Sequence, residues 1–159
     1  MRELLLTFLL VMPTREVAAR NTGDPQFTVF GSKGAPAPQW SEYLKTEQGG
    51  FVIKTGEGVA YAMLFQTHGP ERALYTETSF QNPCKNDAPF LVRSVIAAKQ
   101  KELQIESPAF KCIRNHTTYR VRVRLFADES RKRLVGEHEQ RVLFAMPEDQ
   151  AIALGLTLP

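Results

Sequence analysis

Residues 113–126, IRNHTTYRVRVRLF, decide the fold of this chain. From Tyr119 to Leu125 apolar side chains alternate with arginines, which is the period-two pattern of a β-strand with one buried and one exposed face. A charged turn, DESR at 128–131, follows, and a second strand-like run returns over residues 134–144. Together these segments predict a β-hairpin.

The charges on the outer face of the hairpin predict its register. A turn closed over residues 128–131 places Arg122 opposite Glu137 and Arg120 opposite Glu139. Opposite charges directly across two antiparallel strands stabilise a sheet by about 0.2–1 kcal/mol per pair. We therefore expect cross-strand ion pairs at these two positions.

The approach to the first strand resembles that of a known family. The motif Ile113-x-Asn115-His116-Thr117-x-Tyr119 is similar to the Leu-x-Pro-Gly-Thr-x-Tyr approach to strand F of fibronectin type III domains. In that family the tyrosine hydroxyl bonds back to the upstream backbone and forms a tyrosine corner. The resemblance implies that Tyr119 is the corner residue, with Asn115-His116 in place of Pro-Gly. It concerns the fold alone, because a sandwich hosts many unrelated functions.

Short strands at regular intervals, separated by turn residues, predict an all-β sandwich. With the hairpin they make seven, the number that an immunoglobulin-like, fibronectin type III-like β-sandwich needs. The sequence Asp87-Ala88-Pro89 could equally begin a helix over residues 90–101, so that segment stays open between strand and helix. The expected strands before the hairpin are 51–54, 59–65, 73–80, 90–97 and 102–106.

Residues 20–49 read as an irregular leader, rich in glycine and proline, with one short strand-like run at 27–30. Trp40, Tyr43 and Leu44 have helical spacing, which predicts a short helix over residues 38–45 that caps the core. The alternative for Trp40 and Tyr43 is an aromatic platform for a ligand, although such spacing more often buries side chains.

The C-terminal residues 147–159 have proline and acidic residues at their start and Gly155 near their end. This is typical of a short helix, and we expect it to pack at an edge of the sandwich and shield exposed backbone.

The length of 159 residues and the 43% hydrophobic content indicate one domain with a real core. We expect the sandwich to span residues 50–146. The net charge of +3 is mildly basic and lacks the concentration typical of a nucleic-acid binder.

The N-terminal residues 1–19 read as a secretory signal peptide. Arg2 precedes an apolar run at 4–12, and a small-x-small pattern predicts cleavage after Ala19. The run is too short to span a membrane, so we expect no stable membrane insertion and a periplasmic or secreted protein. The alternative is a short buried helix or strand of a cytosolic protein.

Cys84 and Cys112 fit an oxidising compartment. A disulfide between them would stabilise the fold by roughly 3–4 kcal/mol. When the strands are labelled in the order of the resembling family, both cysteines fall in loops at the same pole, which makes the bridge geometrically sensible. Two unpaired buried thiols are the alternative.

No residue pattern predicts catalysis, a cofactor or a metal centre. His68, His116 and His138 are scattered and none has a partner at metal-ligand spacing. A Gly-x-Ser-x-Gly element is missing from the sequence. Cys112 and His116 are close in sequence, but a disulfide explains both cysteines better than cysteine catalysis does. An enzyme or metal carrier would require the histidines to converge with an acid or a cysteine.

Two surface motifs have competing interpretations. Arg120, Arg122 and Arg124 share one strand face and could bind a phosphate, an anionic polysaccharide or an acidic partner, but a solvated face partly neutralised by glutamates is the favoured interpretation. Asn115-His116-Thr117 matches the N-glycosylation sequon, and the sequence leaves its use open.

We therefore expect an exported, non-enzymatic module that docks to a protein or an envelope polymer through loops at the pole opposite the disulfide. The alternative is a structural envelope component that assembles by strand addition at a sheet edge. The partner and the oligomeric state stay open. The candidate partner-binding residues are His68, Glu71, Arg72, Asp128, Glu129, Arg131 and Lys132.

Overall fold

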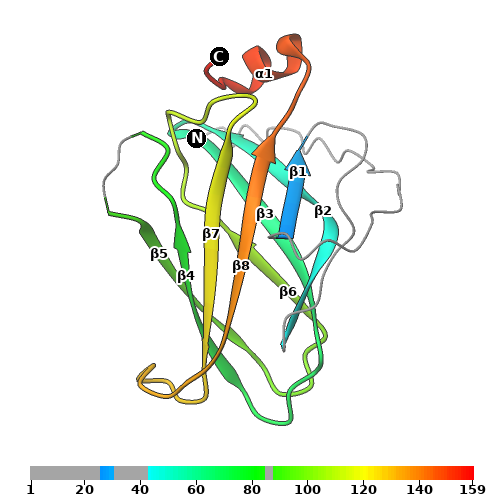
Figure 1. The fold of residues 1–159 in the computed structure, drawn as a ribbon, viewed down its shortest axis with the longest axis vertical. Coiled ribbons are helices and arrows are strands. Elements are labelled where there is room, and N and C mark those ends of the chain that lie inside the picture. Colours follow the sequence, from blue (N-terminus) through cyan, green and yellow to red (C-terminus); the bar gives the residue numbers. More distant parts are fainter. Residues whose placement is uncertain (1–25, 31–42, 85–87) are drawn as a thin grey trace, which may run out of the picture.

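The computed structural model describes residues 26–30, 43–84 and 88–159. Within these ranges the chain is mostly β-strand, arranged in two sheets with one short helix (Figure 1). The elements are β1 (Gln26–Phe30), β2 (Leu44–Thr55), β3 (Gly58–Thr67), β4 (Leu74–Phe80), β5 (Phe90–Ile96), β6 (Glu102–Glu106), β7 (Thr118–Phe126), β8 (Leu134–Phe144) and α1 (Glu148–Leu154).

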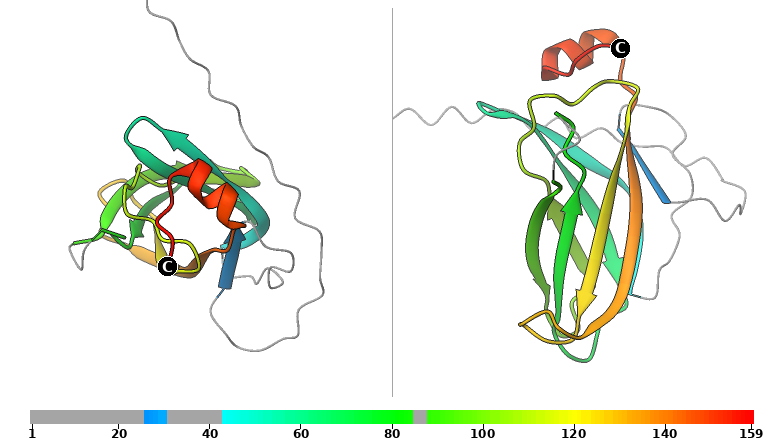
Figure 2. Two further views of the ribbon diagram at one scale, coloured as in Figure 1. Left: turned by 90° about the horizontal axis from the view of Figure 1, so that it is seen from above. Right: turned by 60° about the vertical axis from the view of Figure 1, so that its left-hand side comes forward.

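One sheet has the order β1-β8-β7-β4-β5 and the other the order β2-β3-β6. Neighbouring strands are antiparallel except β1, which pairs in parallel with β8. The two sheets face each other along their length, as the side view in Figure 2 shows. Each of the seven expected strands corresponds to one of β2–β8, and β1 is an eighth strand among the described residues, formed by the short run in the leader.

Aromatic side chains join the two sheets. Tyr61 of β3 packs edge-on against Phe80 at 5.8 Å and against Phe144 at 5.5 Å between ring centroids, and all three are essentially inaccessible to solvent. Such edge-to-face pairs add about 0.5–1.5 kcal/mol each beyond the burial of their area. Burial also raises the pKa of the Tyr61 hydroxyl well above its ordinary value, and the neighbouring Tyr119 acts in the same direction.

The predicted hairpin is present, but its predicted register is wrong by two residues. Arg122 lies opposite Glu139, and Arg124 lies opposite Glu137. Arg120 lies opposite Arg141, so the expected pair of Arg120 with Glu139 does not form.

The longer turn and a bulge explain the shift in register. The Asp128 carboxylate accepts hydrogen bonds from the backbone N–H groups of Lys132 (3.1 Å) and Arg133 (2.7 Å), which extends the turn to Arg133. The pairing then skips Val135 where β7 and β8 meet the turn. A bulge of this kind inserts one extra residue into one strand and moves every partner that follows.

The helix expected over residues 38–45 is wrong at its C-terminal end. Leu44 and Lys45 are the first residues of β2 and pair with Thr67 and Gln66 of β3. Pairing with β3 therefore determines the structure of these residues, although their spacing is helical. Residues 38–42 lie outside the described part of the chain. Tyr43 packs against Gly136, because a Cβ atom on Gly136 would lie 2.9 Å from a ring carbon of this tyrosine.

The segment at 90–101 is resolved in favour of a strand, since Phe90–Ile96 forms β5. The C-terminal helix is confirmed as α1, which ends at Gly155 in a left-handed conformation, φ 82°. It covers one end of the sandwich instead of a sheet edge (Figure 1). The chain after α1 bonds to the β6–β7 loop, where Asn115 N–H donates to Thr157 O at 2.8 Å.

The predicted signal peptide and its cleavage position lie outside the described residues. In the part of the chain that the structure describes, no helix has the length and apolar character needed to cross a bilayer.

Candidate functional site

The predicted tyrosine corner is present at the start of β7. The Tyr119 hydroxyl accepts a hydrogen bond of 2.8 Å from the backbone N–H of Arg114, five residues upstream. His116 occupies the place of the glycine in the family motif and has a left-handed backbone, φ 57°. This left-handed conformation is one that glycine adopts more readily than any other residue.

Asn115 is a buried structural residue, exposed to only 2%. Its Nδ2 group donates to Met146 O at 2.8 Å, and its Oδ1 atom accepts from Met146 N–H at 3.0 Å. Both ends of the side chain thus hold the C-terminal segment, so the sequon is not accessible to a glycosylating enzyme in the folded protein.

The predicted disulfide is confirmed. Cys84 and Cys112 are bonded, with their Cα atoms 4.8 Å apart, and join the β4–β5 loop to the β6–β7 loop. We call this end of the sandwich, with α1 and the β2–β3 turn, the disulfide pole (Figure 1).

A cavity of about 250 Å³ lies at the disulfide pole. Across its rim the Lys54 ammonium donates to Ala153 O at 2.7 Å and thereby joins β2 to α1. The ionisable side chains in its lining are Lys54, Glu57 and Lys111. The lining residues are 54–59, Phe110, Lys111, Leu154 and Gly155.

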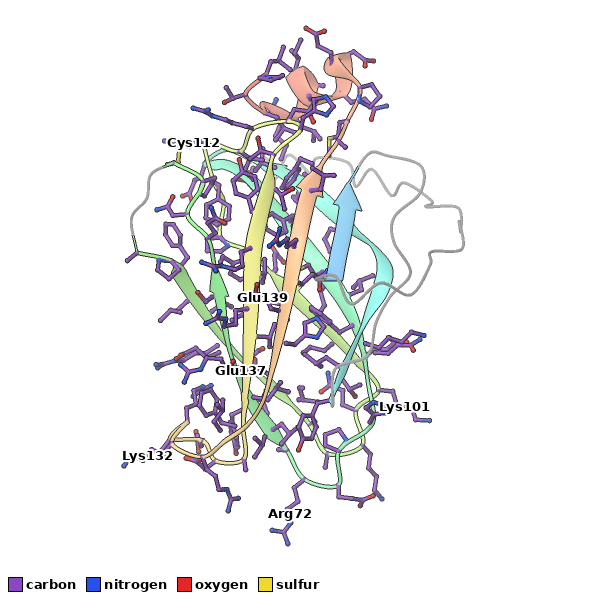
Figure 3. All side chains as sticks on the ribbon, in the orientation of Figure 1. Arg72, Lys101, Cys112, Lys132, Glu137 and Glu139 are labelled. Atoms are coloured by element: carbon purple, nitrogen blue, oxygen red, sulfur yellow. A yellow bond between two sulfur atoms is a disulfide. The ribbon has the colours of Figure 1, made fainter. Side chains whose placement is uncertain are left out.

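The opposite end gathers three loops, residues 68–73, 97–101 and 127–133, which we call the loop pole. Figure 3 shows Arg72 and Lys132 at the end remote from Cys112, and Lys101 in the same half of the molecule, on the side away from Lys132. The sequence interpretation placed the first and third loops together and missed the second. Strand alternation could have found it, because every second connection of an antiparallel sandwich returns to the same pole.

Backbone hydrogen bonds tie the first two loops together. Lys99 N–H donates to Pro70 O at 2.7 Å, and Thr67 N–H donates to Lys101 O at 2.8 Å. The Thr67 hydroxyl also donates to Gln100 O. Loops held in this way need little further ordering when they bind.

The third loop is organised by two of the predicted site residues. Hydrogen bonds from Ser130, Lys132 and Arg133 lower the pKa of Asp128 to about 2. Arg131 docks the loop on β4, since its Nε atom donates to Thr76 O at 3.3 Å and its guanidinium lies 5.9 Å from the Tyr75 ring centroid. Asp128 and Arg131 therefore shape the loop.

The loop pole is predominantly basic. Acidic side chains exposed there are Glu71 and Glu129. Clustered charge of one sign raises the association rate with a partner of the opposite sign. The exposed basic residues are Arg72, Lys99, Lys101, Lys132 and Arg133.

Two residues of the loop pole have left-handed backbones, Lys99 at φ 60° and Arg131 at φ 54°. A residue with a side chain adopts this region rarely and at a cost in free energy, and such residues concentrate at functional sites.

The three histidines do not converge. His138 is buried in the core, with its ring centroid 5.3 Å from that of Phe65. Burial lowers the pKa of His138 to about 4, and a bond to Gln140 opposes this shift only in part. His68 follows β3 at the loop pole, and His116 precedes β7 at the disulfide pole. Within the described ranges no three His, Cys, Asp or Glu side chains are grouped closely enough to hold a metal ion.

The three arginines of β7 have different environments. Arg122 bonds to Glu139 at 3.0 Å, and Arg124 lies 3.7 Å from Glu77 and 3.5 Å from Glu137. Arg120 has no ion pair among the described residues, and neither has Arg141 across from it.

Comparisons with protein-family models, curated proteins and solved structures give no match. The proposals below consequently rest on the geometry and charge of the chain itself.

Proposed function

We propose that this chain is an exported, non-catalytic binding module whose loop pole captures an acidic protein partner. The observation that carries the proposal is the excess of exposed basic side chains on three loops of one pole. Main-chain hydrogen bonds join the first two loops, and the Arg131 side chain docks the third on β4.

We assign the sandwich to a fibronectin type III-like arrangement. Among β2–β8, the first, second and fifth strands share one sheet, and the third, fourth, sixth and seventh share the other. Each sheet therefore combines strands from the first and the second half of the chain, which is typical of the Greek-key connectivity of immunoglobulin-like sandwiches. The tyrosine corner at Tyr119 supports the same assignment.

Export is supported by the Cys84–Cys112 disulfide. Such bonds persist in secreted and periplasmic proteins and are rare in reducing compartments. The apolar segment at residues 4–12 is consistent with the same route.

A charge-reversal comparison tests the loop pole. Lys101→Glu with Lys132→Glu changes two exposed residues there, and Lys111→Glu with Arg114→Glu makes the same change in net charge at the disulfide pole. After affinity capture from the envelope or secreted fraction and identification of the partner, we expect the first pair to weaken binding at least about tenfold at low salt and the second pair to leave it unchanged. Equal effects of the two pairs would contradict the proposal.

A second candidate function, assembly by strand addition, is favoured by β5. This strand lies at the end of its sheet, where only β4 pairs with it among the described strands. Leu91 and Val95 are 57% and 47% exposed, and its one charged residue, Arg93, is bonded to Glu77. An edge without proline or free charge is open to pairing with another strand.

Sedimentation velocity distinguishes this second candidate. Leu91→Lys with Val95→Lys should abolish concentration-dependent assembly, whereas Ile152→Lys, which alters an exposed apolar residue of α1, should not. Assembly that survives the double substitution would exclude β5 as the assembly edge.

A further inference from the structure

Arg120 and Arg141 lie directly opposite each other on β7 and β8, where the hairpin register predicted an arginine–glutamate pair. Both side chains are exposed, and each lies between buried neighbours on its strand, so both project from the outer face of the sheet. Like charges directly across a sheet are destabilising. The pair is thus locally unfavourable in the free protein, and a bound anion would relieve the repulsion between the two charges.

The backbone pairing brings the two Cα atoms close together. Phe144 N–H donates to Thr117 O at 3.3 Å, which marks residues 117 and 144 as a hydrogen-bonded pair. Hydrogen-bonded and non-hydrogen-bonded pairs alternate along an antiparallel ladder. The pair of Arg120 with Arg141 lies three positions further along the ladder, so it is a non-hydrogen-bonded pair. Cα atoms in such pairs are about 4.5 Å apart, closer than in the alternate type.

The neighbours whose side chains the structure describes leave this pair uncompensated. Glu139, on the same face of β8, already accepts from Arg122 at 3.0 Å. On the other side, Gln81 of the β4 end is uncharged, and its Oε1 atom accepts from the backbone N–H of Arg120 at 3.0 Å. Among the described residues no carboxylate pairs with either guanidinium.

We propose that Arg120 and Arg141 form a binding site for a tetrahedral oxyanion, a phosphate or sulfate group carried on a larger molecule. Each guanidinium presents a planar fork of N–H donors that matches two acceptor oxygens. Two forks together are best matched by a group with more than two acceptor oxygens. A phosphate or sulfate monoester supplies three terminal oxygens, whereas a carboxylate supplies two. The flat sheet face leaves the remainder of the larger molecule in solvent.

This site is independent of the loop pole. It lies on the half of the sheet nearer the disulfide pole, since Arg120 is two residues from the start of β7 and Arg141 three from the end of β8. Figure 3 shows Glu139 on β8 between Glu137 and that end. Failure of the loop-pole experiment would leave this proposal intact, and the reverse also holds.

The test uses inorganic phosphate and sulfate as probes, with chloride and acetate at the same ionic strength and pH, and amide NMR titrations of the whole chain. We expect phosphate and sulfate to shift the signals of residues 118–122 and 139–143 saturably. Arg120→Gln and Arg141→Gln should each weaken this binding about tenfold or more, because hydrogen bonds to charged groups are lost. Arg141→Lys, which keeps the charge but loses the fork, should be intermediate.

Arg93→Gln is the matched control, because it removes the same charge from the same sheet face but at an arginine already bonded to Glu77. It should bind phosphate like the wild-type chain. In chloride alone, Arg120→Gln should raise Tm by a few degrees by removing the repulsion, and Arg93→Gln should not.

Two results would overturn the proposal. Equal phosphate shifts in the wild-type chain and in Arg120→Gln would show only a general salt effect. Acetate binding as tight as phosphate binding would refute the requirement for a tetrahedral group.

Discussion

The hydroxyl of Tyr119 accepts a hydrogen bond from the backbone N–H of Arg114 and so anchors the β6–β7 loop to the strand that follows it. The ring of Tyr119 packs on Phe144, with centroids 6.0 Å apart, and is 5% exposed. This corner lies beside Asn115, whose side chain holds the segment leading to α1.

Tyr119→Phe removes the corner bond and keeps the ring. We expect the free energy of unfolding to fall by about 1–3 kcal/mol, because the Arg114 N–H loses its acceptor. Urea denaturation measures this change. Tyr75→Phe is the control, since the Tyr75 hydroxyl has no hydrogen bond within the described residues and the ring contact with Arg131 is kept. A loss in the control as large as that in Tyr119→Phe would contradict the importance of the corner.

Gly56 lies in the β2–β3 turn and Gly58 is the first residue of β3, and the two differ in what a side chain would meet. A Cβ atom on Gly58, φ 146°, would lie 2.4 Å from Phe110 O, whereas one on Gly56 would meet nothing within 4 Å. Gly58→Ala should therefore destabilise the fold by roughly 2–4 kcal/mol, and Gly56→Ala by less than about 0.5 kcal/mol. Thermal unfolding of the two variants checks the difference, and similar Tm values would refute the close approach of Gly58 to Phe110.

Lys99 has a left-handed backbone, and its neighbour Ala98 does not. Lys99→Gly should stabilise the fold by about 1 kcal/mol by relieving this conformation. Ala98→Gly should destabilise it by about 0.4–1 kcal/mol, because glycine gives the unfolded chain more freedom. Denaturant unfolding of both variants tests the loop geometry, and destabilisation by Lys99→Gly would contradict it.

His138 should make stability depend on pH. Its pKa is lowered from 6.5 to about 4 in the folded protein, mainly by burial, so the unfolded chain binds more protons between these values. Stability should therefore fall as pH decreases from about 6.5 to about 4, by up to about 3 kcal/mol from this residue. His138→Gln should flatten the profile over this window in urea titrations at several pH values. An unchanged profile would show that His138 does not control it.

The hairpin and the tyrosine corner could be predicted from the sequence because both are local. Alternation over residues 119–125 specifies a half-buried strand, and the approach motif specifies the bond of Tyr119. The pairing register could not be predicted in the same way. A shift of the pairing by an even number of residues keeps the same strand face buried, so burial does not select one register. The register is set instead by the turn at Asp128 and the bulge at Val135.

The remaining errors have similar causes. Leu44 has helical spacing with Trp40 and Tyr43 in the sequence. Its cross-strand partner Thr67 lies on β3, far along the chain, and this pairing makes Leu44 the first residue of β2. Lys99 and Lys101 belong to no sequence motif, and only the fold brings their loop against the loop that carries Pro70 and Arg72. Arg141 belongs to no motif in the sequence, and its significance depends entirely on its position opposite Arg120.

The most direct test of the proposed binding role is amide chemical-shift mapping of the chain with its captured partner. We expect shifts concentrated in residues 68–73, 97–101 and 127–133, which form the loop pole. Shifts confined to β5, or to the disulfide pole around Cys84 and Cys112, would contradict it.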